Sequence, residues 1–397
     1  MNILAINAGS SSVKFATFAA GSSAPDAFGA ASADPHSAQI QIKFHHGADL
    51  HAITAGTKDA AESLPTAVIR ALAESRCVFT DRIKSIDAIG QRVVHGGTRF
   101  SKSIRVDAAV KAEIARLVEL APLHNSLAVD AIAAVEKSFP GVPQVAVFDT
   151  AFFATLPPAA HVYALPYEWY ETMGIRRFGF HGLSHSYCAG HAAKMLGRKQ
   201  EELRLVICHL GSGCSASAIK NGAPLATTMG FTPLEGIVMG TRPGNIDPGI
   251  IPYLQRHKNL SFEQIDDILN HRSGIFGISG VSSDYREVEH AAAQGNQRAQ
   301  LALDIFANSI RATIGAFAVT LGGLDALVFT GGIGEHSAPL RARVCEGLQC
   351  LGIALDSPKN SAVAGDADIS AAASTVKTIV METREELVIA QETERTV

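Results

Sequence analysis

The sequence predicts a mixed α/β protein built from two related domains. At 397 residues the chain is longer than the roughly 250–300 residues that a single hydrophobic core organises. Apolar runs of strand length alternate along it with segments of helical periodicity. A short strand–turn–strand pattern also occurs twice, about half a chain apart. Together these observations favour two α/β domains of similar design.

The strand predictions are short apolar or β-branched runs bounded by turn-forming residues. In chain order they are Ile3–Asn7, Val13–Phe18, Ile89–His95, Gln144–Phe148, Arg204–His209, Ser215–Lys220, Ala326–Thr330 and Thr375–Met381. The helix predictions rest on apolar spacing and on end signals such as the capping box Ser261/Gln264. They are Pro65–Glu74, Val110–Leu120, Phe262–His271, Pro339–Leu348 and a final helix Glu386–Thr396. The Ala/Ser-rich stretches Ala19–Ala38 and Ser357–Ser374 predict surface loops or irregular edges.

Composition excludes several classes of protein. With 47% hydrophobic and 18% charged residues the chain is not disordered, and its net charge of −4 gives no sign of a nucleic-acid or membrane partner. Its six cysteines form no CxxC pair, which favours a reduced, cytoplasmic protein. The N-terminus is typical of a first strand rather than a signal peptide. The apolar stretch Ile314–Gly334 is interrupted by Asp325, which favours a buried helix followed by a strand over a membrane span.

The repeated pattern places two Gly/Ser turns at an offset of 202 residues. Ile6–Ser12 precedes one strand-like run, and Cys208–Cys214 precedes another. Chance resemblance between two ordinary hairpins is the alternative. Successive backbone N–H groups in such turns bind anions, and Lys14 would add a positive charge beside the first turn. We therefore expect one phosphate-binding hairpin in each half of the chain.

A third candidate phosphate loop is Phe329–Ser337, which follows an apolar strand and precedes a helical segment. It contains Gly332-x-Gly334 of the dinucleotide fingerprint, but Ser337 stands where the third glycine belongs. The chain contains no Gly-Lys dipeptide and hence no Walker A loop. Any bound nucleotide is therefore held by some other kind of loop.

Five polar clusters lie at or just after predicted strands, where ligands of α/β sheets usually bind. They are 92–97, 122–125, 148–150, 178–185 and 240–249. The clusters also allow other interpretations. A zinc pair is conceivable for His181 and His185, but no HExxH glutamate accompanies it.

Single residues of these clusters also have structural alternatives. Asp149 could cap a helix, Asp247 could stabilise a turn, and His95 and His124 could be core histidines. If Arg92 is buried, as its apolar neighbours suggest, it needs an anionic partner.

Taken together, these stretches resemble the acetate kinase family of the actin/Hsp70/sugar-kinase superfamily. The matching motifs are NAGSSSVKF at 7–15, RVVHGG at 92–97, APLHN at 121–125, FDTAFF at 148–153, RRFGFHGLSH at 176–185, HLGSG at 209–213, the run 228–249, SGVSSDYRE at 279–287, FTGGIGEHS at 329–337 and Glu385-Glu386-Leu387. They occur in the family's order over almost the whole chain. Ser212, His336 and Arg384 depart from the residues usual in the family and leave nucleotide preference open.

The resemblance implies two ribonuclease-H-like domains with an active site in the cleft between them. The expected domains are residues 1–150, completed by 386–397, and 151–385, the second also serving dimerisation. The implied reaction is reversible phosphoryl transfer from Mg-ATP to acetate, giving acetyl phosphate and ADP, with Mn²⁺ as a possible substitute for Mg²⁺. A cytoplasmic homodimer is implied as well.

The resemblance also implies roles for individual residues. Asp149, His181 and Arg242 are the implied catalytic residues, and Asn7 and Glu385 the metal site. Acetate would be bound by Arg92, Val94, Leu123, Phe180 and Pro233. The nucleotide would be bound by Ser10, Ser12, Lys14, His209, Leu210, Gly211, Ser212, Gly213, Asp284, Tyr285, Arg286, Gly331, Gly332, Ile333, Gly334, Glu335 and His336.

Physical chemistry favours cations over bases as the main catalysts of such a reaction. A carboxylate nucleophile is already ionised at pH 7, so the obstacle is repulsion between two anions. Arg92, Arg242 and Mg²⁺ would offset this repulsion, His181 could donate to the phosphoryl oxygens, and Asp149 could orient a metal-bound water or an arginine. The alternatives are a propionate or butyrate kinase, an Hsp70- or actin-like ATP-driven binding module, and a sugar kinase with Asp149 as base.

Overall fold

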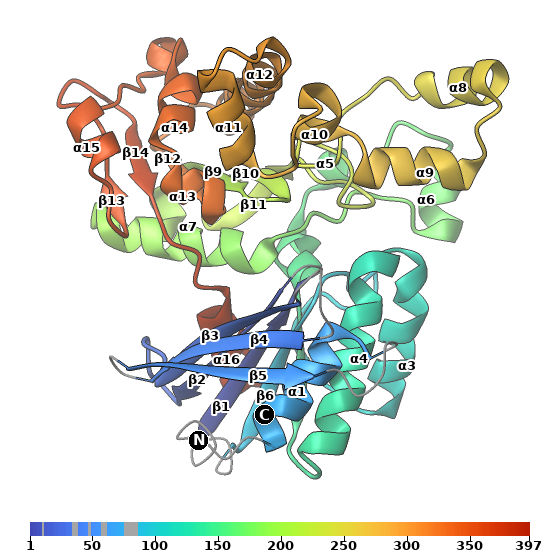
Figure 1. Cartoon of the computed structure of the whole chain (residues 1–397). Helices are drawn as coiled ribbons and strands as arrows, with labels where there is room; N and C mark the ends of the chain where they lie inside the picture. The colour runs from blue at the N-terminus through green and yellow to red at the C-terminus, as the bar shows by residue number, and fades with distance from the viewer. Residues whose placement is uncertain (10–11, 34–38, 47–48, 57–61, 75–85) are drawn as a thin grey trace. The chain divides into compact units, whose positions relative to one another are not determined.

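The computed structural model describes residues 1–9, 12–33, 39–46, 49–56, 62–74 and 86–397. The chain forms two compact units, each with its own sheet (Figure 1). Unit 1 comprises Met1–Ala154 and Arg384–Val397, and unit 2 comprises Thr155–Thr383. The C-terminal segment therefore returns to the unit that the N-terminal segment begins.

Unit 1 contains an eight-stranded sheet in the order β5-β4-β3-β2-β1-β6-β8-β7. Its strands are β1 (Asn2–Ala8), β2 (Val13–Ala19), β3 (Ala27–Ala33), β4 (Gln39–His46), β5 (Asp49–Gly56), β6 (Ala88–Val93), β7 (Ile104–Arg105) and β8 (Gln144–Phe148). Its helical segments are α1 (Leu64–Glu74), α3 (Ala108–Arg116), η1 (Leu117–Glu119), α4 (Pro122–Ser138), η2 (Asp149–Thr155, which ends one residue into unit 2) and α16 (Glu385–Thr396).

The alternation of side chains along β1 explains how helices cover the unit 1 sheet. Leu4 and Ile6 are buried in one cluster with apolar residues of α1 and α4. The helix α16 packs on β1, β6 and β8. At Gly90 of β6 a Cβ atom would lie 2.1 Å from Thr393 Oγ1 of α16, so only glycine allows this approach.

Unit 2 contains a six-stranded sheet in the order β11-β10-β9-β12-β14-β13. Its strands are β9 (Arg204–Leu210), β10 (Cys214–Lys220), β11 (Ala223–Thr227), β12 (Ala326–Thr330), β13 (Ala367–Asp368) and β14 (Lys377–Val380). Its helical segments are α5 (Pro158–His161), α6 (Tyr167–Met173), α7 (Gly182–Leu196), η3 (Gln200–Glu202), α8 (Ile250–Lys258), α9 (Phe262–His271), α10 (Gly274–Ser279), α11 (Tyr285–Ala293), α12 (Gln297–Leu321), α13 (Gly331–His336), α14 (Ala338–Cys345), η4 (Leu348–Leu351) and α15 (Ser357–Ser361).

The two sheets share one topology. In each sheet, the first strand pairs with an antiparallel second strand, which pairs in turn with an antiparallel third strand. On its other side the first strand is followed by two strands parallel to it. This is the strand order of a ribonuclease-H-like domain, and the predicted fold class is confirmed. The two Gly/Ser turns join β1 to β2 and β9 to β10, so the repeated pattern marks the same hairpin in each unit.

Several predicted elements need correction. Within Ala19–Ala38, predicted as a loop, Ala27–Ala33 forms β3 and pairs with β2 and β4. Alanine and glycine favour strands weakly, so pairing rather than local preference makes this strand. Within Ser357–Ser374, predicted in the same way, α15 and β13 form. The helix predicted at Pro339–Leu348 ends at Cys345, and Gly347 adopts φ 84°.

The apolar stretch Ile314–Gly334 covers the end of α12, all of β12 and the start of α13. By length and composition α12 could cross a membrane. It packs instead on β9, β10 and β11, and one face of it, which includes Phe306, Ile310 and Ile314, is buried in unit 2. The predicted buried helix followed by a strand is therefore confirmed.

Candidate active site

Unit 1 gathers charged side chains at the carboxyl ends of β1, β6 and β8. These strands are parallel neighbours, so their ends meet at one edge of the sheet. Asn7 lies near the end of β1, Arg92 near the end of β6, and Asp149 directly follows β8. Glu385, the first residue of α16, joins them. Four separate segments of the chain thus converge on one polar cluster.

Arg92 and Asp149 form the centre of this cluster. Asp149 is fully buried, and its Oδ2 lies 2.6 Å from Arg92 Nη2. Both carboxylate oxygens also accept from Arg92 Nε at 3.1 Å. Burial lowers the pKa of Arg92, but the negative charges of Asp149 and Glu385 outweigh that effect, so the pKa is raised. The anionic partner predicted for a buried Arg92 is therefore present.

Asn7 links the arginine to two glutamates. Its Nδ2 donates to Glu385 Oε2 and Glu386 Oε1, both at 2.8 Å, while its Oδ1 accepts from Arg92 Nη1 at 3.1 Å. Three carboxylates thus surround one guanidinium, and their oxygens are ligands that suit Mg²⁺. No group of three or more His, Cys, Asp or Glu with metal-binding geometry occurs among the described residues. A site with few protein ligands fits Mg²⁺, which usually keeps several waters.

Hydrogen bonds join the 92–97 and 121–125 motifs of unit 1. The His95 backbone N–H donates to Asn125 Oδ1, and Asn125 Nδ2 donates back to the His95 carbonyl, both at 3.0 Å. His95 Nδ1 accepts from the backbone N–H of Gly97 at 2.9 Å. His95 is therefore a buried structural histidine, which was one of its alternatives. Val94, the residue before His95, is buried, with 5% of its surface exposed. The Leu123 side chain lies outside the described part of the structure.

The first hairpin carries the predicted phosphate contacts of unit 1. Lys14 is exposed on β2 directly opposite Asn7 on β1, so both occupy one face of the sheet. The Ser12 carbonyl accepts from the Gly9 backbone N–H at 2.9 Å and closes the turn. Ser10 lies outside the described residues.

In unit 2 the second hairpin brings His181 and Arg242 together. Gly213 ends the turn, and a Cβ atom there would lie 2.9 Å from Arg242 Nη2 and 3.3 Å from His181 Nε2. Only glycine therefore lets these two side chains approach the backbone so closely. Arg242 Nη1 donates to the Pro233 carbonyl at 2.6 Å, and burial lowers the pKa of Arg242. Within unit 2 no carboxylate pairs with this arginine in the described residues, so it is suited to bind an anion.

A group of histidines and serines lies behind His181. His181 Nδ1 contacts Ser215 Oγ at 2.9 Å, and His185 Nε2 contacts the same oxygen at 2.7 Å. The rings of His181 and His209 stack with centroids 4.3 Å apart. The pKa of His185 is well below its usual value, because burial disfavours the imidazolium and His209 adds repulsion. These contacts are with hydroxyls and rings, and the zinc alternative gains no support from the described residues.

The run 228–249 is anchored in unit 2 by the 176–185 segment and by Tyr163, which the sequence analysis did not single out. Tyr163 donates from its hydroxyl to Glu235, and Arg177 also contacts Glu235. The Phe178 backbone N–H donates to the Gly230 carbonyl at 2.9 Å. A tyrosine 72 positions away from its partner leaves no local signal in one sequence. Asp247 accepts from the Gly249 backbone N–H at 2.8 Å, which is its structural alternative, a turn.

The predicted nucleotide loops of unit 2 lie after β12 and at the start of α11. Glu335 Oε1 accepts from the backbone N–H groups of Gly331 and Thr383, each at 2.9 Å. Asp284 caps α11, and a hydrogen bond from Arg286 lowers the pKa of its carboxyl. Tyr285 is buried against Phe306 at a ring distance of 5.8 Å, so its side chain belongs to the core.

The remaining predicted site residues differ in exposure. Phe180, Leu210, Gly331 and Gly334 are buried, whereas Ser212, Gly332 and His336 are exposed, and Gly211 and Ile333 are partly exposed. Arg341, which sequence analysis did not single out, is 1% exposed and donates to the carbonyls of Gly334 and Glu335 at 2.8 Å. These hydrogen bonds hold the C-terminal end of the predicted loop in place.

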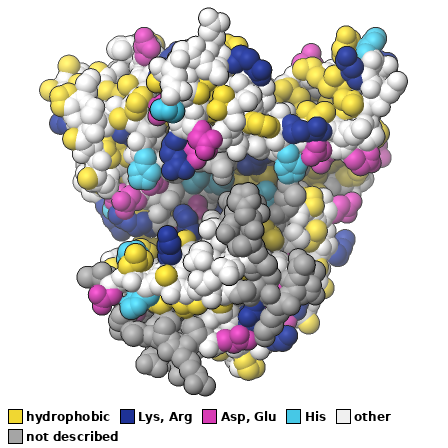
Figure 2. Space-filling model, in the orientation of Figure 1, with side chains coloured by type: hydrophobic (Ala, Val, Ile, Leu, Met, Phe, Trp, Pro, Cys, Tyr) yellow, Lys and Arg dark blue, Asp and Glu magenta, His cyan; other side chains and the backbone are white. Residues whose placement is uncertain are grey.

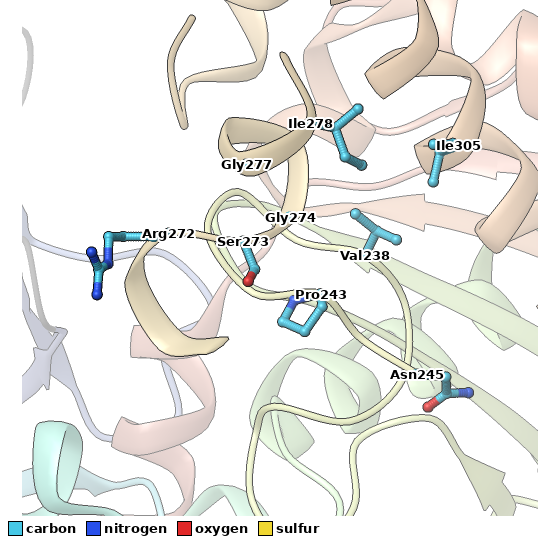
Figure 3. A pocket seen from close by; sticks show the side chains of 9 residues that line it. All are labelled: Val238, Pro243, Asn245, Arg272, Ser273, Gly274, Gly277, Ile278 and Ile305. Carbon is cyan, nitrogen blue, oxygen red and sulfur yellow. The ribbon is translucent and has the colours of Figure 1, made fainter. Parts of the chain in front are cut away.

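Unit 2 contains a pocket of about 410 Å³ that Pro243, the residue after Arg242, helps to line (Figure 3). Its walls combine apolar side chains with the backbone of the 243–245 and 272–277 segments. The lining residues are Val238, Pro243, Asn245, Arg272, Ser273, Gly274, Gly277, Ile278 and Ile305. None of the predicted site residues lines it.

Comparison with known proteins gives a consistent result over the whole chain. The family model described as the acetokinase family matches residues 2–391. An acetate kinase from Nostoc punctiforme is 46% identical over 403 residues, with 98% of each chain covered. The crystal structure of Porphyromonas gingivalis acetate kinase superposes with a TM-score of 0.87 at 38% identity, with 99% of each chain covered. That of a propionate kinase from Francisella tularensis superposes with a TM-score of 0.91 at 39% identity, with 100% of each chain covered.

Proposed function

This chain belongs to the acetokinase family, and we propose that it transfers a phosphoryl group reversibly between ATP and acetate, giving acetyl phosphate and ADP. The observation that carries the proposal is the close approach of Arg242 and His181 to the backbone at Gly213, with no carboxylate paired with Arg242 among the described residues of unit 2. A transferring phosphoryl group spreads negative charge over its oxygens, and such donors stabilise that charge.

Unit 1 would supply the binding of the acceptor. Arg92 can neutralise the acetate carboxylate, and the paired hydrogen bonds that it donates to Asp149 support a role for Asp149 in orienting the arginine. Buried Val94 would contact the methyl group, together with the implied contributions of Leu123, Phe180 and Pro233. The acceptor is already an anion, so no residue is required to remove a proton from it.

The nucleotide would be bound by the hairpins and loops described above. Backbone N–H groups of the turns and Lys14 suit its phosphates. Asn7 and Glu385 would hold Mg²⁺ with the help of water. When bound, the ion would supply positive charge to the phosphate oxygens. Mn²⁺ has the same preference for oxygen ligands.

We further propose that the protein is a cytoplasmic homodimer. Large hydrophobic side chains are exposed on α6, α8 and α9, and Figure 2 shows hydrophobic surface over the last two helices. They include Tyr167, Met173, Tyr253 and Phe262, of which Phe262 is 71% exposed. A second copy would cover this face. The described cysteines are free thiols, as in a reducing compartment.

The test is an acyl-phosphate assay with Mg-ATP and acetate, propionate or butyrate, in which hydroxylamine traps the product. We expect hydroxamate with acetate at low concentration. Preferential reaction with propionate would favour a propionate kinase, the function named for the structural relative with the TM-score of 0.91. ATP hydrolysis without any trapped product would contradict the proposal and favour an ATP-driven binding module. Light scattering of the purified chain tests the dimer, which a monomeric mass would contradict.

A further inference from the structure

A chain of hydrogen bonds leads from the core of unit 2 to His181. Ser217 Oγ lies 2.7 Å from His185 Nδ1, His185 Nε2 lies 2.7 Å from Ser215 Oγ, and Ser215 Oγ lies 2.9 Å from His181 Nδ1. Ser215 and Ser217 are two residues apart on β10, so they share a face. His181 caps α7 and His185 lies one turn further, so these two also share a face. Helix and strand periods therefore place the four groups in one row.

The buried end of the row sets its direction. Ser217 is fully buried, and His185 Nδ1 is the single hydrogen-bond partner of its hydroxyl among the described residues. If His185 donated to Ser217, the hydroxyl proton of Ser217 would have no acceptor, which is unfavourable in the core. Ser217 therefore donates and His185 Nδ1 accepts. Burial keeps His185 neutral, so its one ring proton lies on Nε2.

The same reasoning assigns the donor and the acceptor in the other two hydrogen bonds of the row. His185 Nε2 donates to Ser215 Oγ. The hydroxyl proton of Ser215 then points to the other nitrogen within reach, His181 Nδ1. A neutral His181 that accepts at Nδ1 carries its proton on Nε2, the atom that lies close to the backbone of Gly213 beside Arg242.

We propose that Ser217, His185 and Ser215 are positioning residues that hold the proton of neutral His181 on Nε2, ready to donate to the transferring phosphoryl group. A neutral donor adds a hydrogen bond beside Arg242 without adding a repelling charge. In the opposite direction, neutral His181 would present a lone pair to an anion. The inference rests on the proposed role of His181 in phosphoryl transfer, but the direction of the hydrogen bonds stands apart from it.

The first experiment reads the tautomer directly. The full chain is labelled with ring-¹⁵N histidine, and two-bond ¹H–¹⁵N correlations are recorded, with His181→Asn identifying the His181 signals. We expect a neutral His181 with the proton on Nε2 in the wild-type protein. A proton on Nδ1, or a fully protonated ring at neutral pH, would overturn the proposal. This readout needs no activity, so it remains decisive even if acetate proves not to be the substrate.

The second experiment compares kinetic effects. Ser215→Ala is expected to lower kcat by about 10- to 100-fold, the range known for partners that orient metal-bound histidines, with KM for ATP and acetate changing less than about twofold. Ser217→Ala should lower kcat less and in the same way. Ser215→Thr keeps the hydroxyl and should restore most of the rate.

Thr227→Val is the matched control, because Thr227 Oγ1 is a buried hydroxyl of the same sheet that donates to the Ala216 carbonyl outside the row. It should leave kcat within about twofold of the wild type, as expected of a substitution away from the reacting groups. Equal kcat values for Ser215→Ala and Thr227→Val would overturn the proposal. If circular dichroism shows that Ser215→Ala is misfolded, the wild-type tautomer and the kcat of Ser217→Ala decide the question.

Discussion

The two units carry the same hairpin on the same sheet topology, yet a partly buried arginine has opposite surroundings in each. In unit 1, Arg92 is surrounded by carboxylates, with Asp149 Oδ2 at 2.6 Å. In unit 2, Arg242 donates to a backbone carbonyl and lies beside His181 at Gly213. An arginine that is neutralised by its own protein binds a further anion weakly, whereas one without a carboxylate gains by binding an anion. The comparison therefore assigns the strongest anion affinity to unit 2.

The difference also appears in the pKa directions. Neighbouring carboxylates overcome burial and raise the pKa of Arg92, while burial lowers the pKa of Arg242. The first arginine is held rigidly by at least three hydrogen bonds to Asp149, which suits the binding of one fixed carboxylate. The second suits a group whose charge is redistributed during the reaction.

The largest expected effect comes from removing the arginine of unit 2. Arg242→Ala should lower kcat by about 10³-fold, because its contact strengthens as charge spreads over the phosphoryl oxygens, and KM should rise less. Steady-state kinetics with ATP and acetate measure both. Arg272→Gln is the control, since its ion pair with Asp267 is solvent-exposed and contributes little. A raised KM with unchanged kcat for Arg242→Ala would reassign this arginine to ground-state binding and weaken the comparison.

Breaking the ion pair of unit 1 should have a smaller effect on the rate and an added effect on stability. Asp149→Asn leaves Arg92 buried without its main partner, so we expect kcat to fall about 10²-fold. We expect the free energy of unfolding to fall by about 3 kcal/mol. Denaturant titration and kinetics measure the two.

The double variant Arg92→Met/Asp149→Leu separates these two losses, because it removes both charges together. It should recover stability without recovering activity. Unimpaired turnover of Asp149→Asn would remove Asp149 from the mechanism.

Much of this fold could be predicted from local patterns, and the exceptions have physical causes. The strands Gln144–Phe148 and Ala326–Thr330 and the capping box at Ser261 are found as predicted, because apolar runs and caps are local signals. By contrast, β3 is rich in alanine and forms through pairing with its neighbours. Strand pairing between distant segments leaves little trace in one sequence.

The candidate site divides in the same way. The need of a buried Arg92 for an anion follows from its apolar neighbours, and the structure supplies Asp149. The row Ser217–His185–Ser215 could not be predicted, since it depends on which face of β10 meets which face of α7. Arg341 escaped notice because three of its four acceptors are backbone carbonyls, which every sequence has, and the fourth is the side chain of the distant Asn360.

The proposed contact between Val94 and the acceptor is tested by Val94→Ala. Removing two methyl carbons leaves room for a longer acyl chain, so kcat/KM for propionate relative to acetate should rise about tenfold. Val93→Ala is a matched control, because Val93 is buried in a core cluster of unit 1 and its loss costs stability without reshaping the acceptor pocket. The hydroxamate assay with both acids measures the ratio. If both variants shift the ratio equally, Val94 has no special place at the acceptor.

The smallest expected effect is a dependence of unit 2 stability on acid. The pKa of His185 lies well below its usual value in the folded protein, whereas the unfolded chain takes up a proton near pH 6.5. Below that pH the unfolded state binds more protons than the folded state. The free energy of unfolding therefore decreases as the pH is lowered, by about 1.4 kcal/mol at pH 5.5. Urea unfolding followed by the single tryptophan, Trp169 of unit 2, measures this loss. His185→Gln keeps an amide donor for Ser215 but cannot titrate, so its stability should fall less between pH 7.5 and 5.5, in roughly that amount. An equal fall in both proteins would mean that His185 is protonated in the folded state, and the neutral row behind His181 would lose its basis.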